Sequence, residues 1–205
     1  MSGPADGDIA ILLLAAGASR RMGGRDKMLE PLGDRPLLRE RAEICLKTAA
    51  ARVYVVLPPH APERRRALEG LDLDCVVAPR AAEGMAFSLR AGIAPLPAGT
   101  RGVLVVLADM PEITSDDMDQ MIRTAEAGGD DILRATGADG RPGHPVYFPA
   151  WCFGAFEALD GDRGARDLLA AHADRLREIP LPGRRATTDL DTPEDWVRWR
   201  RRHRL

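Results

Sequence analysis

The N-terminal apolar run and the loop that follows it constrain this chain more than any other feature. Residues Ile9 to Leu14 are all apolar, and the stretch from there to Lys27 is rich in small residues, contains three glycines and ends in fixed cations. Exposed loop N–H groups and glycine let a polyanion approach the main chain, and Arg21 and Lys27 can neutralise its charge. The pattern predicts a buried strand that runs into a phosphate-binding loop.

Two familiar phosphate-binding motifs do not describe this loop. Lys27 is followed by Met28, so the GK[ST] ending of a P-loop is missing, and the chain contains no GxGxxG fingerprint. The missing fingerprint disfavours a dehydrogenase that binds a dinucleotide.

Short β-branched apolar runs alternate with helical patterns along the rest of the chain. Strands are predicted at 9–14, 52–57, 74–78, 103–107 and 131–134, with weaker signals at 145–148 and 176–180. Helices are predicted at 36–50, 61–69, 82–94, 115–127, 150–159, 163–172 and 193–203, with N-caps at Ser115 and Thr192. This alternation predicts an α/β fold in which a mostly parallel, twisted sheet carries helices on both faces.

In such a sheet, ligands bind outside the carboxyl ends of the strands. The glycine loop follows the first predicted strand and Asp109 follows the fourth, so both are expected at the same edge. Asp109 comes just after the apolar run 102–107 and is followed by Pro111. A carboxylate there suits Mg²⁺, which prefers oxygen ligands and needs only one or two carboxylates. From the residues alone, an aspartate that stabilises a turn or caps a helix is an equally good interpretation.

Composition limits the class of protein. With 205 residues and 45% apolar content, the chain suits one domain over 1–205, whose first eight residues are expected to be flexible. A formal net charge of −2 gives no general case for binding nucleic acid or a membrane surface. The basic, aromatic stretch 196–204 favours a solvated helix end whose tryptophans pack inward.

The same composition indicates a cytoplasmic protein. The longest apolar run, 9–16, is far short of the roughly 20 residues that span a bilayer, and residues 1–8 lack the basic start of a secretory signal. Cys45, Cys75 and Cys152 are widely spaced and lack a metal-ligand pattern, which favours small buried hydrophobes in a reducing compartment.

Six segments together resemble a known family. They are L-A-A-G-A-S-R-R-M-G-G-R-D-K at 14–27, G-M-A-F-S-L at 84–89, A-D-M-P at 108–111, G-H-P-V at 143–146, G-D-R-G-A at 161–165 and D-L-D-T-P-E-D at 189–195. In this order they resemble the signatures of nucleotidyltransferases that act on molybdopterin, and most closely the molybdenum cofactor cytidylyltransferase group, which is related to molybdopterin guanylyltransferase. The resemblance covers nearly the whole chain.

The resemblance implies a Rossmann-like, glycosyltransferase-A-like nucleotidyltransferase. It implies transfer of CMP from CTP to molybdopterin with release of pyrophosphate, dependent on Mg²⁺ with Mn²⁺ as the alternative. The product would pass to a molybdoenzyme. The family's L-A-A-G, as opposed to L-A-G-G, implies CTP, and Ala16 would narrow the pocket around a pyrimidine. Two departures, Pro142 and Ala108, leave the acceptor less defined than the nucleotide.

The resemblance also assigns roles to residues. Lys27, Arg21 and Asp109 would be catalytic, and Asp109 and Asp191 would hold the metal, with Asp189 as the fallback. The acceptor would contact His144, Arg163 and Arg166, without proton transfer by His144. The nucleotide-binding residues would be Leu14, Ala15, Ala16, Gly17, Ser19, Arg21, Gly23, Lys27, Gly84, Met85 and Ser88.

Several alternatives stay open at this point. Ser19 could bind phosphate or stabilise the turn, and Met85 with Leu89 has the i, i+4 spacing of core packing. Arg20 and Arg25 are expected to be solvated, and Arg163 and Arg166 could pair with Asp162 and Asp167 on a helix surface. The acceptor could be a sugar phosphate or another small phosphorylated cofactor, the nucleotide could be GTP, and the protein could be a non-catalytic carrier of molybdenum cofactor.

Overall fold

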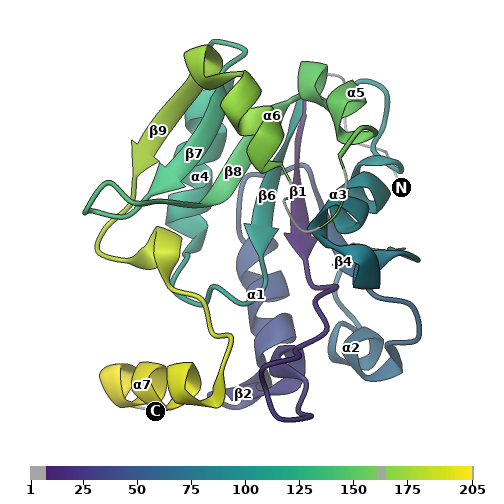
Figure 1. The fold of residues 1–205 in the computed structure, drawn as a ribbon, viewed down its shortest axis with the longest axis vertical. Coiled ribbons are helices and arrows are strands. Elements are labelled where there is room, and N and C mark those ends of the chain that lie inside the picture. Colours follow the sequence, from purple (N-terminus) through teal and green to yellow (C-terminus); the bar gives the residue numbers. More distant parts are fainter. Residues whose placement is uncertain (1–7, 160, 162–164, 205) are drawn as a thin grey trace.

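The computed structural model describes residues 8–159, 161 and 165–204 (Figure 1). The expectation of a flexible start, at residues 1–8, falls almost wholly outside these residues. The described chain folds around a seven-stranded sheet of order β5-β4-β1-β6-β8-β7-β9, in which only β8 runs antiparallel to its neighbours. The strands are β1 (Ile9–Leu14), β4 (Arg52–Leu57), β5 (Asp74–Val77), β6 (Gly102–Leu107), β7 (Ile132–Thr136), β8 (Pro142–Pro149) and β9 (Leu176–Pro180).

β1 lies inside the sheet, between β4 and β6, and is buried on both faces. Ile11 and Leu13 belong to the core on one face, while Leu12 and Leu14 belong to the core on the other. This position explains why the strand is an unbroken apolar run instead of an alternating pattern.

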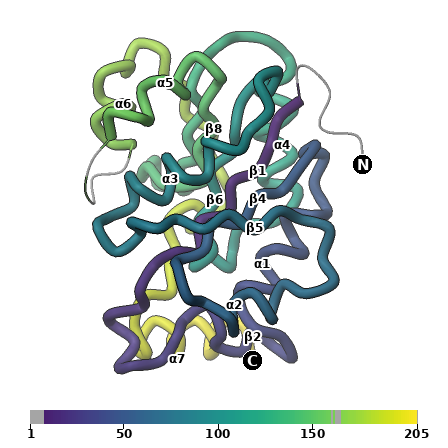
Figure 2. Tube along the Cα trace, turned by 90° about the vertical axis from the view of Figure 1, so that its right-hand side faces the viewer, coloured from purple at the N-terminus to yellow at the C-terminus, as the bar shows by residue number. Residues whose placement is uncertain are grey.

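Helices cover both faces, as predicted, and Figure 2 shows the two layers from the side. One face carries α1 (Leu37–Cys45) and α4 (Ser115–Glu126), with α2 (Pro62–Ala67) beside α1. α7 (Pro193–His203) lies past the carboxyl ends of β1 and β6, and its tryptophans join the same core (Figure 1). The other face carries α3 (Met85–Ile93), α5 (Phe153–Phe156) and α6 (Arg166–Ala171). Trp196 and Trp199 of α7 are buried, so the basic tail is a solvated helix end with tryptophans packed inward. None of the described helices has the length and apolarity that a membrane span requires.

The predicted cap of α4 was one residue off. Thr114, not Ser115, is the N-cap, since its side chain accepts from the Asp117 N–H and the Asp117 carboxylate accepts from the Thr114 N–H. Thr192 caps α7 as predicted, through the same reciprocal arrangement with Asp195.

Several predicted helices are shorter in the structure. The first ends at Cys45 and continues as turns, and the 150–159 stretch splits into the 3₁₀ turn η3 (Ala150–Cys152) and α5. The 163–172 helix begins at Arg166, and its first predicted residues lie outside the described ones. Short elements had no periodic signal: β2 (Pro31–Leu32), β3 (Arg35–Pro36), η1 (Lys27–Leu29), η2 (Ala81–Glu83), η5 (Ala173–Arg175) and η6 (Arg185–Thr187). Cys45 and Cys152 are buried as expected, whereas Cys75 is only partly buried.

Gly92 allows α3 to pack closely on the central strand. A Cβ at this position would lie 2.3 Å from a Leu12 methyl and 2.9 Å from a Val56 methyl. The start of α3, which faces the site described below, is therefore placed by a close helix–sheet approach.

Gly92→Ala is expected to lower the free energy of unfolding by about 1–3 kcal/mol, because overpacking forces the helix from the sheet. Gly154→Ala in α5 is the matched control, since its Cβ would meet nothing within 4 Å. Urea unfolding of both variants measures the difference, and equal stability of the two would contradict the close approach.

Candidate active site

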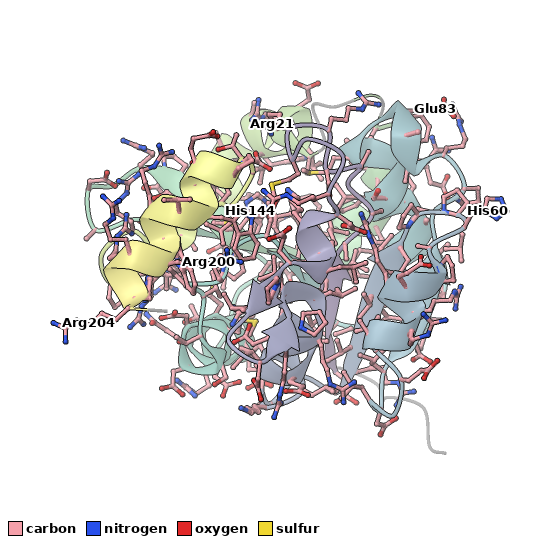
Figure 3. All side chains as sticks on the ribbon, turned by 90° about the horizontal axis from the view of Figure 1, so that it is seen from below. Arg21, His60, Glu83, His144, Arg200 and Arg204 are labelled. Atoms are coloured by element: carbon pink, nitrogen blue, oxygen red, sulfur yellow. The ribbon has the colours of Figure 1, made fainter. Side chains whose placement is uncertain are left out.

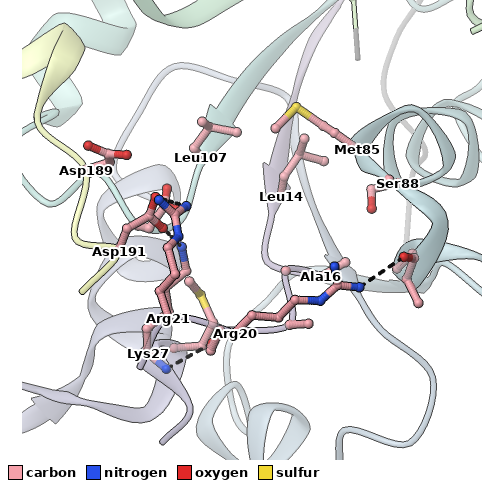
Figure 4. Close-up of a pocket in the computed structure, with 18 of the residues that line it drawn as sticks. Leu14, Ala16, Arg20, Arg21, Lys27, Met85, Ser88, Leu107, Asp189 and Asp191 are labelled. Carbon is pink, nitrogen blue, oxygen red and sulfur yellow. Dashed lines mark hydrogen bonds and ion pairs between the residues drawn. The ribbon is translucent and has the colours of Figure 1, made fainter. Parts of the chain in front are cut away.

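A cavity of about 520 Å³ opens at the carboxyl ends of β1 and β6 (Figure 4). The loop after β1, the η2–α3 junction and the carboxylates that follow β6 and precede α7 form its walls. It is lined by Leu14, Ala16, Gly17, Ala18, Ser19, Arg20, Arg21, Lys27, Met28, Ala81, Ala82, Gly84, Met85, Ser88, Leu107, Asp109, Arg166, Asp189 and Asp191. Its place is the strand-end edge at which parallel sheets bind ligands.

The glycine loop brings free backbone donors to this cavity. Within the described chain, no group accepts a hydrogen bond from the N–H groups of residues 16–21. Gly17 has open space where a Cβ would project. Consecutive free N–H groups in a tight loop attract anions, so these donors are available to an anion in the cavity.

Arg64, in α2, holds this loop in shape. Its guanidinium donates to the carbonyl oxygens of Ala15 at 2.6 Å and Gly17 at 2.9 Å. It also donates to both carboxylate oxygens of Asp26, at 2.7 and 2.9 Å. These contacts replace the hydration of a buried cation and tie the start of the loop to its end.

Asp26 and Ser19 in turn position Lys27. The Asp26 carboxylate caps η1 by accepting from the Met28 N–H at 3.0 Å. The Ser19 hydroxyl donates to Asp26 at 3.3 Å and accepts from the Lys27 backbone N–H at 3.1 Å. Of the two roles left open for Ser19, the hydroxyl makes the contacts of the turn-stabilising one.

The Lys27 ammonium joins the two predicted metal-binding carboxylates. Its Nζ lies 2.5 Å from Asp109 Oδ2 and 2.6 Å from Asp191 Oδ1. The other carboxylate oxygen of Asp191 accepts from the exposed Arg21 guanidinium. Burial lowers the pKa of Lys27, but attraction to the two aspartates outweighs it and leaves that pKa above its ordinary value.

Two backbone contacts bring the segment before α7 to this place. The Leu190 N–H donates to the Asp109 carbonyl oxygen at 2.9 Å. Gly143, at the start of β8, packs so closely on η6 that a Cβ would lie 1.7 Å from the Ala186 oxygen. The glycine of the G-H-P segment therefore permits the approach that delivers Asp189 and Asp191.

The carboxylates of the cavity are of the chemical type that binds a hard divalent cation, and Asp109 and Asp191 are paired with Lys27. The cavity lining holds three carboxylates, Asp109, Asp189 and Asp191, and four cations, Arg20, Arg21, Lys27 and Arg166. Burial raises the pKa of Asp191, but hydrogen bonding and attraction from Lys27, then Arg21, hold it below its ordinary value. Burial and the charges of Asp191 and Asp109 raise the pKa of Asp189. Carboxylate oxygens are the ligands that Mg²⁺ and Mn²⁺ prefer, but among the described residues no three side chains of the metal-binding types are grouped closely enough to hold an ion by themselves.

The opposite wall is the η2–α3 junction. Gly84, with a φ of 133°, ends η2 and precedes the first residue of α3, Met85. Leu89 is buried in the core, whereas Met85 is 38% exposed and lines the cavity, so the two do not share a packing role. Ser88 is buried beneath them.

Arg20 is exposed, as expected, and it also lines the cavity. Its side chain crosses the opening, and Nη2 lies 3.5 Å from the Ala82 oxygen (Figure 4). Arg25 instead points to the outer side of the loop, where it pairs with Glu30 at 3.1 Å.

Three predicted residues lie away from the cavity lining. Ala15 is buried behind the loop, Gly23 is exposed with a φ of 61°, and His144 lies on β8. Figure 3 looks from the side to which β1 and β6 point, and labels Arg21 and His144 there. Arg163 lies outside the described residues, as does Asp162. Every other predicted nucleotide, metal or acceptor residue lines the cavity.

His144 is neutral at neutral pH. Burial lowers its pKa to about 4, against attraction from Asp109 and with repulsion from Arg134 and Arg166. A neutral imidazole can donate one hydrogen bond and accept another, which agrees with a binding role instead of proton transfer.

Two residues that the sequence analysis missed are Arg64 and Asp26. Arg64 is one of three consecutive arginines on a short helix, and only the rotational setting of α2 buries it. The P-E-R-R-R pattern carries no signal that separates the buried arginine from its neighbours.

Comparison with known families agrees with this geometry. Residues 11–176 match the MobA-like NTP transferase domain. The chain belongs to this family. The family is one of NTP transferase domains, and the chain has the Rossmann-like sheet that the sequence predicted.

The chain is similar to proteins with several different named functions. It is 30% identical over 195 residues to nicotine blue oxidoreductase from Paenarthrobacter nicotinovorans, covering 91% of this chain and 94% of that protein. It is 27% identical to 2-C-methyl-D-erythritol 4-phosphate cytidylyltransferase from Salinibacter ruber, covering 92% and 90%. It is 32% identical over 130 residues to the bifunctional protein GlmU from Kineococcus radiotolerans, which covers 62% of this chain but only 26% of GlmU.

Solved structures are similar over nearly the whole chain. Rv0371c from Mycobacterium tuberculosis H37Rv superposes with a TM-score of 0.84 at 29% identity, covering 95% of this chain and 98% of that one. A complex of Rv0371c with manganese superposes with a TM-score of 0.79 at 27% identity, covering 93% and 97%.

Arg64→Ala is expected to lower the free energy of unfolding by about 3–5 kcal/mol, because it leaves the Asp26 carboxylate without its charged partner. Arg66→Ala on the exposed side of α2 is the control and should change stability by less than about 0.5 kcal/mol. Urea unfolding at neutral pH makes the comparison. Equal effects of the two variants would show that Arg64 does not hold the loop.

His144 should make stability depend on pH. Its folded pKa is about 4 against an ordinary 6.5, so between these values the unfolded chain binds a proton that the folded chain does not. Stability should therefore fall as pH falls through this window, by up to about 3 kcal/mol. His144→Gln should flatten the dependence of the unfolding free energy between pH 7 and pH 4.5, and the exposed His60→Gln should not. A slope that survives in His144→Gln would locate the titrating group elsewhere.

Proposed function

We propose that this protein transfers CMP from CTP to the phosphate of molybdopterin and releases pyrophosphate. The observation that carries the proposal is the Lys27 ammonium between Asp109 and Asp191, at the floor of a cavity whose wall is a loop of free N–H groups. Triphosphate charge and a divalent cation both need this combination of fixed cations, backbone donors and carboxylates.

The proposed reaction needs the protein mainly to hold charged groups in the right positions around the phosphates. An oxygen of the acceptor phosphate forms a bond to the α-phosphorus, and the bond from that phosphorus to the bridging oxygen of pyrophosphate breaks. The attacking phosphate is already anionic, so no general base is needed, in agreement with a neutral His144. The loop N–H groups, Arg21 and Lys27 would hold the triphosphate and stabilise charge that develops on the leaving group.

Asp109 and Asp191 would hold the divalent cation, with Asp189 beside them. When bound, a Mg²⁺ or Mn²⁺ ion there would neutralise phosphate charge and orient the triphosphate. The solved manganese complex of the relative Rv0371c supports a divalent cation in this family, and Mg²⁺ is part of the proposal.

Selection of cytosine is proposed to come from the wall opposite the carboxylates. Ala16 places a methyl group in the cavity lining where family members that take guanine carry glycine. Gly84, Met85 and Ser88 would complete the base pocket. The similarity to a cytidylyltransferase supports CTP, as does the L-A-A-G sequence.

The proposal also covers the acceptor side. His144 and Arg166, with Arg163, would contact molybdopterin, and the product would pass to a molybdoenzyme. A cytoplasmic location suits three unpaired cysteines in the described chain.

Calorimetric titration with CTP, GTP, ATP and UTP in the presence of Mg²⁺ tests the nucleotide. We expect CTP to bind most tightly and Asp109→Asn to weaken it by at least about tenfold, because a metal ligand is lost. Asp34→Asn, at a carboxylate that is 89% exposed, is the control. Tighter binding of GTP than of CTP would mean that the protein transfers GMP and not CMP. Failure of every triphosphate to bind, with NADPH binding in its place, would contradict the proposal and favour oxidoreductase chemistry.

Ala16→Gly is expected to relax base selection, because removal of one methyl group widens the cavity. The ratio of GTP to CTP dissociation constants should move toward unity by a factor of about 10. Ala18→Gly, in the same loop and lining, is the matched control. An unchanged ratio in Ala16→Gly would refute the role of this methyl group.

A further inference from the structure

Arg134 is a partly buried arginine whose Nε lacks the partners that the buried arginines have. Arg41 donates to the Ile113 oxygen at 2.6 Å and to both carboxylate oxygens of Glu40, and Arg64 is fully paired as described above. The Arg134 Nε, by contrast, is shielded from solvent and has no hydrogen-bond partner within residues 8–159, 161 and 165–204.

The position of Arg134 rules out a simple surface role. It lies on β7, opposite Val146 of β8 and Glu178 of β9. By strand alternation it shares a face with Ile132, which packs in the same core as Leu168 and Leu169 of α6. The side chain therefore lies under the helix whose first residue, Arg166, lines the cavity.

The surroundings of Arg134 favour an anion. Burial lowers its pKa, attraction to exposed Glu178 opposes this, and repulsion from Arg166 adds to it. Arg134 and Arg166 also both repel a proton on His144, so the three side chains lie within electrostatic reach of one another. Two cations beside a neutral imidazole form a positive group with donors to spare.

This group adjoins the chemistry. The charge of Asp109 acts to raise the pKa of His144. Arg166 lines the same cavity as Asp109 and Lys27. The group lies on the β7–β8 side of Asp109, whereas the glycine loop lies on the β1 side. An anion bound there would stand across Asp109 from the triphosphate loop.

We propose that Arg134, together with His144 and Arg166, forms a subsite that holds a phosphate monoester of the acceptor. The assignment of Arg134 is new, and its link to an acceptor rests on the proposed function. The planar guanidinium can donate two parallel hydrogen bonds to phosphate oxygens. An arginine kept without an internal partner is then explained by the partner that arrives with the substrate.

The test uses inorganic phosphate as the probe and the Nε–Hε resonances of arginine as the readout. In the wild-type protein, phosphate should shift the Arg134 resonance saturably, and Arg134→Gln both assigns that resonance and weakens phosphate binding by about tenfold or more. Arg177→Gln is the matched control, because Arg177 is exposed on neighbouring β9 and points to the other face. It should leave phosphate binding unchanged.

A second variant separates a ligand-binding role from a structural one. Arg134→Met should raise the melting temperature in the absence of phosphate, because the shielded Nε that has no partner is replaced by part of an apolar chain of similar length. A structural arginine would give a lower melting temperature, which would overturn the proposal. The same holds if phosphate binds wild-type protein and Arg134→Gln equally, or leaves the Arg134 resonance unmoved.

Titration of the same variants with CTP and Mg²⁺ separates this subsite from the proposed function. We expect unchanged CTP affinity in Arg134→Gln. If the wild-type protein binds phosphate at Arg134 but no triphosphate, the proposed function fails and the anion subsite stands. If CTP binds and phosphate does not shift the Arg134 resonance, the subsite is wrong and the proposed function stands.

Discussion

The Lys27 ammonium is the point at which three distant parts of the chain meet. It pairs with Asp109, 82 residues away, and with Asp191, 164 residues away. The lysine comes from η1 after the glycine loop, Asp109 from the turn after β6, and Asp191 from the segment before α7. A cation as buried as Lys27 is tolerated only with charged partners. The loop, the sheet edge and the C-terminal segment must therefore be in place together for any one of them to be stable.

Arg64 and Arg134 differ in how their hydrogen-bond donors are used. Arg64 donates hydrogen bonds to Asp26 and to two loop carbonyl oxygens, and these contacts fix the shape of the loop. The backbone N–H groups of residues 16–21 have no acceptor in the described chain. A site whose donors are held by neighbouring contacts can bind charge without first rearranging. Arg134 keeps its Nε without a partner in the described chain, on the other side of Asp109. The two arginines suggest how a fixed triphosphate loop and an acceptor subsite could serve one reaction.

Much of the fold could be predicted from the sequence, because the central strands β1, β4 and β6 are buried on both faces and leave continuous apolar runs. Element ends were less predictable. Thr114 and Ser115 can both cap a helix, and only the extended backbone of Thr114 decides between them. The first helix stops at Cys45, although apolar residues continue the pattern beyond it.

The cavity was predicted where backbone chemistry left a sequence signal, as in the glycines, Lys27 and the aspartates at strand and helix boundaries. The supporting contacts were not. Arg64 and Arg134 are distinguished from other arginines only by which side of α2 or β7 is buried, and this depends on tertiary packing. A glycine is needed at position 143 because the Ala186 carbonyl oxygen lies where a Cβ would be, and no local sequence pattern shows this contact.

The measurement that tests the account most directly is transfer of label from CTP that carries ³²P in the α-phosphate. Purified protein would be incubated with labelled CTP, Mg²⁺ and molybdopterin, and the products separated. The account predicts label in the dinucleotide form of the acceptor with pyrophosphate in equal amount, and loss of both in Asp109→Asn. Label that stays in CTP, or leaves as free CMP without modification of molybdopterin, would contradict it.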